Sequence, residues 1–107
     1  MNGWIMSEVW RDVQGFEGLY EVSSLGNVRS PRGIVTPYKS SKGYLKVGLF
    51  KNCKDHKRRV NRLVAQAFIP NPNDYPCVYY RDGNKENNSV NNLEWGERNR
   101  GKSHEMR

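Results

Sequence analysis

One helix and two strands are predicted by residues 60–95, VNRLVAQAFIPNPNDYPCVYYRDGNKENNSVNNLEW. The helix has one apolar face, whose residues are spaced at i, i+1, i+4 and i+5: Leu63, Val64, Ala67 and Phe68. This spacing predicts a helix over residues 62–68, with Asn61 as its N-cap and Pro70 beyond its end. Residues 77–80 and 93–96 have the composition of strands, and a long polar turn joins them.

Short strands and turns are predicted upstream of this helix. In residues 8–30, EVWRDVQGFEGLYEVSSLGNVRS, large apolar residues alternate with polar ones and glycines interrupt the pattern. Residues 30–41 contain two prolines and predict a loop with a brief strand at Ile34–Val35, whereas residues 43–50 predict a longer strand. Because the apolar period changes from two to about 3.6 near Val60, the fold class is predicted to be α+β.

Three regions are predicted along the 107 residues of the chain. Residues 1–7 lack periodicity and are expected to be flexible. A strand-rich module is expected at residues 8–50 and a second domain at residues 51–107. The basic tail of the second domain predicts a final helix interrupted by Gly101.

Charge is the first indication of function. The chain has 18 Lys and Arg against 11 Asp and Glu, a formal net charge of +7. Its densest basic stretch, residues 51–62, holds six basic residues against one acid, Asp55. Such a stripe can release counterions from a phosphate backbone and so favours nucleic-acid binding. The alternative interpretation is a solvated strand face.

Composition excludes several classes of protein. Cys53 and Cys77 are too few for a disulfide framework, and no four-ligand Cys/His set at zinc spacing surrounds them. The sequence has neither the roughly 20 apolar residues of a membrane span nor the layout of a signal peptide. We therefore expect a cytoplasmic protein with no membrane partner.

Several separated motifs resemble those of one family. Residues 8–30 look like the module that precedes HNH homing endonucleases of phages and bacteria, while LVAQAFIPNP, DGNKENN and NNLEW resemble the HNH domain itself. The resemblance implies a His-Me finger (ββα-metal, HNH-like) domain at residues 51–107, which hydrolyses phosphodiesters with a divalent cation. It also implies a phage or mobile-element origin and a bacterial host cell. In that family a histidine activates water, an asparagine orients the histidine, and a further Asn or His binds the metal.

The residues that the family uses for catalysis are substituted in this sequence. Tyr80 occupies the position of the catalytic histidine, and Tyr79 occupies that of the metal ligand before it. Gly101 stands where the family's final helix carries its metal-binding Asn or His, and Asn61 stands where the family often has a histidine. The orienting asparagine is retained as Asn92. We therefore expect no metal ligands and no cofactor, with Mg²⁺ or Mn²⁺ required only if nuclease activity is retained.

Other polar residues have structural interpretations. His56 is predicted to be a solvated turn residue, and His104 is the alternative base of a shifted active site. The asparagine-rich turn at residues 84–92 is predicted to be structural rather than a DNA-contacting loop, because asparagine tolerates left-handed backbone and caps turns.

Phosphate contacts are predicted for eight basic side chains: Arg58, Arg59, Arg62, Arg81, Lys85, Arg98, Arg100 and Lys102. Three functions remain open. The first is a protein that binds double-stranded DNA on an HNH scaffold and has lost cleavage. The second is a small viral inhibitor that uses the scaffold to bind a host nuclease or defence complex. The third is an active metal-dependent DNA-nicking endonuclease with a rearranged site.

Overall fold

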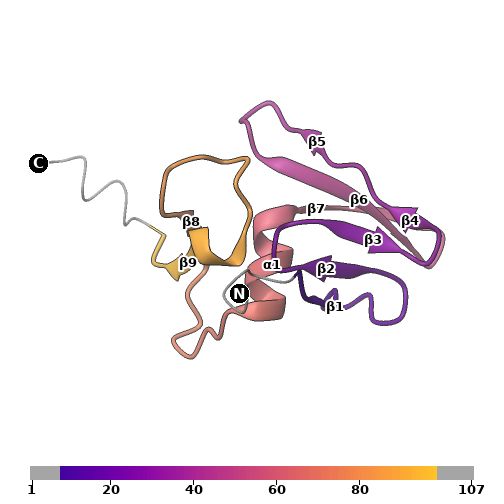
Figure 1. Cartoon of the computed structure of the whole chain (residues 1–107), viewed down its shortest axis with the longest axis horizontal. Coiled ribbons are helices and arrows are strands. Elements are labelled where there is room, and N and C mark those ends of the chain that lie inside the picture. The colour runs from indigo at the N-terminus through magenta and orange to yellow at the C-terminus, as the bar shows by residue number, and fades with distance from the viewer. Residues whose placement is uncertain (1–7, 99–107) are drawn as a thin grey trace, which may run out of the picture.

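A computed structural model describes residues 8–98 of the chain. Within this range the structure has nine strands, one α-helix and one short 3₁₀ helix (Figure 1). The strands form three antiparallel sheets, of four, three and two strands. The confirmed α+β architecture therefore consists of small sheets gathered around a single described α-helix.

The first sheet is formed by β1 (Trp10–Asp12), β2 (Glu21–Ser23), β3 (Val28–Ser30) and β4 (Gly33–Ile34), in that order. The turn between β2 and β3 contains Gly26, which has a positive φ of 92°. A Cβ atom at Gly26 would lie only 2.9 Å from the Cβ of Asn88, so no larger side chain fits there. Beside this contact the Val90 N–H donates a hydrogen bond of 2.8 Å to the Ser24 carbonyl.

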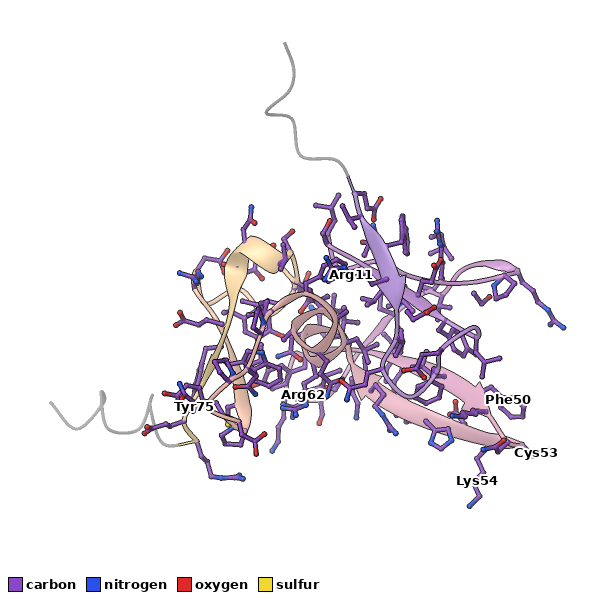
Figure 2. The ribbon with its side chains drawn as sticks, turned by 90° about the horizontal axis from the view of Figure 1, so that it is seen from below. Arg11, Phe50, Cys53, Lys54, Arg62 and Tyr75 are labelled. Carbon is purple, nitrogen blue, oxygen red and sulfur yellow. The ribbon has the colours of Figure 1, made fainter. Side chains whose placement is uncertain are left out.

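The second sheet contains β5 (Tyr38–Lys39), β6 (Leu45–Lys51) and β7 (Lys54–Arg59). Strands β6 and β7 form a hairpin whose two turn residues, Asn52 and Cys53, both have positive φ, as a type I′ turn requires. The predicted module boundary after residue 50 falls inside this hairpin, and the division into two modules stays a prediction. Phe50, Cys53 and Lys54 lie at its far end, away from Arg62 and Tyr75 (Figure 2).

Helix α1 (Val60–Phe68) follows β7 directly and lies between the N-terminal strands and the β8–β9 hairpin (Figure 1). Its apolar face is buried through Val60, Leu63 and Val64. The expected N-cap is wrong: Arg59 is the capping residue and makes no side-chain cap hydrogen bond, while Asn61 is a buried residue of the first turn. The helix begins earlier than predicted because β7 runs into it without a loop.

The third sheet pairs β8 (Cys77–Tyr80) with β9 (Leu93–Gly96), as predicted from their composition. A loop containing the 3₁₀ helix η1 (Val90–Asn92) joins them. The predicted final helix, with Gly101 and His104, lies outside the described residues. Among the described helices, none has the length and apolar character needed to cross a membrane.

One continuous core unites the residues on both sides of the predicted module boundary. Its buried members come from the first sheet and its β1–β2 loop, the β6 strand, α1 and β9: Val13, Phe16, Val22, Val28, Val47, Leu49, Val60, Leu63, Val64 and Leu93. Phe68 is only half-buried at the end of α1, where the guanidinium of Arg11 lies 4.7 Å from its ring centre. The centre of the core is therefore the middle of the helix.

Leu49→Ala should destabilise the fold by about 2–5 kcal/mol, because Leu49 is fully buried and its truncation leaves a cavity. The neighbouring Phe50→Ala is the matched control, since Phe50 is 59% exposed and its substitution should change stability by about 0.5 kcal/mol or less. Urea unfolding of both variants measures the difference. Equal losses of stability would contradict the position of the core.

Candidate nucleic-acid interface

A cavity of about 590 Å³ lies where the end of β7, the first turn of α1 and strand β8 meet. Four basic side chains line it: Arg59, Arg62, Lys85 and Arg98. Its described lining contains no aspartate or glutamate. A concave surface with this charge attracts anions and opposes the approach of a metal cation.

Tyr44 holds two of these cations at the cavity wall. The guanidinium carbon of Arg59 lies 4.0 Å from the centre of the Tyr44 ring, and the Lys85 ammonium lies 4.6 Å from the same centre. Lys85 also donates a hydrogen bond of 2.9 Å to the Lys42 carbonyl. Residues from β7, from the turn before β6 and from the asparagine-rich loop are thereby brought together.

Tyr80, which the resemblance to the family aligns with the catalytic histidine, lines the cavity. Its ring centre lies 6.2 Å from that of Tyr44. Burial, followed by the neighbouring Tyr44, raises the pKa of Tyr80 to about 12, although Arg59 acts in the opposite direction. The phenol is therefore protonated at neutral pH, where it can donate a hydrogen bond but cannot act as a general base.

Tyr79 is also half-buried, and its hydroxyl contacts the main chain that follows β9. The single proton of its hydroxyl is shared between the main-chain carbonyls of Glu97 and Arg98, and the distance to the Arg98 carbonyl is 3.2 Å. The side chain thus fixes the chain that leaves β9. Tyr79 and Tyr80, neighbours on β8, are both half-buried.

Asn61 is a cavity residue that the capping prediction placed outside the helix. It is 2% exposed, and its Oδ1 has no hydrogen-bond partner within residues 8–98. A buried amide oxygen without a partner costs about 1–3 kcal/mol. In the sequence, Asn61 can be found as a polar residue among the apolar residues of one helix face.

Hydrogen bonds of the Asn92 side chain stabilise the loop between β8 and β9. Its Oδ1 accepts a hydrogen bond of 3.1 Å from the Asp82 N–H, and its Nδ2 donates to the Asp82 carboxylate and to the Asn87 carbonyl, each at 2.9 Å. Hydrogen bonds from the Asn84 N–H, Asn87 and Asn92 hold the pKa of Asp82 below its usual value. These contacts agree with the structural interpretation of the asparagine-rich turn.

The remaining predicted DNA contacts are scattered. Arg58 lies on the opposite side of β7 from Arg59, 5.8 Å from the Phe16 ring. Arg81 forms an ion pair of 3.7 Å with Glu94. Arg100 and Lys102 fall outside the described residues. Of the six side chains that the structure describes, Arg59, Arg62, Lys85 and Arg98 share a cavity, and Arg58 and Arg81 are not among its lining residues.

The prediction for His56 was wrong. This residue belongs to β7 rather than to a solvated turn, and its ring packs edge-on against Phe16 at 5.4 Å. Because side chains alternate along a strand, His56 and Arg58 of β7 point to the same side.

The described residues do not fit the divalent metal that the resemblance implies. Magnesium prefers several oxygen ligands, chiefly from carboxylates. Residues 8–98 contain no group of three or more His, Cys, Asp or Glu side chains that could hold a metal ion. Tyr79 and Tyr80, which the resemblance aligns with the family's metal-ligand and base positions, are phenols that line a basic cavity.

A family model described as the NUMOD4 motif matches residues 8–81, more than half of the chain. The chain belongs to the NUMOD4 family. This NUMOD4 chain is 41% identical over 88 residues to the DNA endonuclease I-HmuI of Bacillus phage SP01. The matched region covers 80% of this chain and 51% of that protein. It is also 39% identical over 87 residues to an HNH endonuclease of Acanthamoeba polyphaga mimivirus. That matched region covers 80% of this chain and 26% of the relative.

The fold is similar to a solved structure described as DNA binding and cleavage by the HNH homing endonuclease I-HmuI. The TM-score is 0.84 at 35% sequence identity, over 92% of this NUMOD4 chain and 57% of that chain. The resemblance to HNH homing endonucleases is therefore confirmed. This NUMOD4 chain spans about half the length of I-HmuI and about a quarter of the mimivirus relative.

The raised pKa of Tyr80 predicts a loss of stability at high pH. Tyrosine in the unfolded chain has a pKa of about 10, so between about pH 10 and 12 the unfolded state releases the proton more readily than the folded state. The stabilisation is complete below this window and is lost as the pH rises through it. Tyr80→Phe, which cannot ionise, should lose less stability between about pH 9 and 12 than the unmodified protein in urea unfolding. Parallel curves would contradict the burial of this phenol.

Proposed function

We propose that this chain binds double-stranded DNA through a basic surface centred on the cavity and does not cleave it. The charge of the cavity is the observation that supports this proposal: four cations and no carboxylate occur in the described lining, where a metal nuclease needs metal ligands and a base. The cytoplasm of a bacterial host cell is the proposed place of action.

The basic surface extends from the cavity along the outer face of the β6–β7 hairpin. Lys46 pairs with Arg59 across the strands, and Gly48 pairs with Lys57, so all three cations face the same side. Tyr38 of β5 pairs with Lys46 on this face. A two-stranded ribbon fits the major groove of DNA, and its cations can contact phosphates on either side.

The relatives support DNA as the ligand. I-HmuI is named as a DNA endonuclease, and the similar solved structure is described as binding and cleaving DNA. Because this chain spans only about half of that protein, transfer of DNA binding to it is part of the proposal.

The loss of cleavage follows from the substituted positions. A general base must accept a proton near neutral pH, and general-base help is typically worth about 10² to 10⁴ in rate. The buried phenol of Tyr80 is protonated at that pH. Tyr79 uses its hydroxyl to hold the chain after β9, and Gly101 supplies no side-chain ligand.

Lys46→Gln combined with Lys57→Gln should weaken binding to a DNA duplex and reduce the slope of log Kobs against log salt by about two, because each phosphate contact contributes about one unit. Arg29→Gln combined with Arg32→Gln removes the same charge from the first sheet and is the matched control. Fluorescence anisotropy over a salt series measures both slopes. Unchanged DNA affinity in the lysine variant would oppose the ribbon surface, and no DNA binding at all would favour the protein inhibitor.

The unmodified protein should leave a supercoiled plasmid intact in Mg²⁺ or Mn²⁺, because its family positions supply neither a base nor metal ligands. The triple change Tyr79→Asp, Tyr80→His and Gly101→Asn should restore metal-dependent nicking, whereas Tyr80→His alone should restore little. Gel electrophoresis of the plasmid measures nicking. Cleavage by the unmodified protein that a chelator abolishes would instead support an active nuclease and direct the search for a base to His104.

A further inference from the structure

The cavity at the family's active-site position has the opposite charge character from a metal site. Its described lining provides Arg59, Arg62, Lys85 and Arg98, and it offers no carboxylate that would neutralise them. A divalent cation entering this space would meet only like charges. A phosphate group entering it would meet several cations at short range, and each would supply N–H donors.

The cations nearest the tyrosines are held in place before any ligand arrives. Arg59 and Lys85 both rest on Tyr44, at 4.0 and 4.6 Å from its ring centre. Arg62 donates one hydrogen bond of 2.8 Å, from Nη1 to the Pro76 carbonyl. Cations restrained in this way lose less conformational entropy on binding an anion than free surface side chains lose.

Neutral groups of the cavity complement these charges. The Tyr80 phenol keeps its proton at neutral pH and can donate it in a hydrogen bond to a phosphate oxygen. The buried Asn61 amide has an unpartnered side-chain atom, and rotation of the amide about its last torsion places an N–H donor at the same point.

We propose that this cavity is a metal-independent site for one phosphate of the DNA backbone, with Arg59 and Lys85 as its charged ligands. The protein cations take the place that a metal ion has in a nuclease of this family, and they bind the phosphate without activating water. The proposal rests on DNA binding as the proposed function, and it names the group that the cavity recognises.

Fluorescence anisotropy with a labelled, hydroxyl-ended duplex tests the site, because all phosphates of such a duplex are backbone diesters. At matched ionic strength, the full chain should bind equally well, within about twofold, in EDTA and in Mg²⁺. Arg59→Gln and Lys85→Gln should each weaken binding by about tenfold and lower the salt slope by about one. Arg32→Gln, an exposed arginine of the β3–β4 turn, is the matched control and should change affinity by less than about twofold.

Urea unfolding of each variant verifies the fold, and Lys85→Gln keeps the test valid if Arg59→Gln is unstable. A requirement for Mg²⁺, or DNA affinity of both cavity variants equal to that of the unmodified protein, would overturn the phosphate site. If Lys46→Gln with Lys57→Gln still weakens binding in that case, the proposed DNA-binding function stands and only the cavity proposal fails. If the unmodified protein binds no DNA, both proposals fail.

Discussion

Burial of one short helix holds this molecule together. An isolated two-stranded sheet is at best marginally stable, and the sheets of three and four short strands also need an apolar face to pack on. Helix α1 supplies that partner through Val60, Leu63 and Val64, and it packs on strands of all three sheets. Asn61 and Arg62 of the same helix line the cavity, so this one segment contributes to both the core and the basic surface.

Hydrogen bonds hold the parts that the apolar core does not reach. The Asp82, Asn87 and Asn92 side chains bind one another and the backbone of the loop between β8 and β9. Because this loop carries Lys85, the asparagines determine where that cation lies even though they contact no ligand. The Asp82 carboxylate is held within this loop by hydrogen bonds and is not among the residues that line the cavity.

Local composition was sufficient to predict the strands of the third sheet, and local periodicity was sufficient to predict the helix and the α+β class. It did not place Asn61, because the helix start depends on the direct junction with β7, and a capping residue and a buried polar residue look alike in sequence. The cavity was also hidden: Tyr44, Arg59 and Lys85 are far apart in the chain and meet only through tertiary packing. The separation of Arg58 from Arg59, in contrast, follows from the alternation of any strand and was available from the sequence. The polar composition around His56 predicts a turn, and its packing on Phe16 was hidden because Phe16 lies 40 positions earlier in the sequence.

The contact of Gly26 with Asn88 has a consequence for the order of folding. The β2–β3 turn packs against a loop that follows it by about sixty positions, and the Val90 N–H bonds the Ser24 carbonyl beside it. During synthesis, the first sheet therefore has no partner for this turn until the chain has been extended to residue 90. Contacts of such long sequence separation slow folding, since the entropy of a large loop must be lost before they form. The nascent chain should accordingly acquire its complete core late, when β9 and α1 can close on the first sheet together.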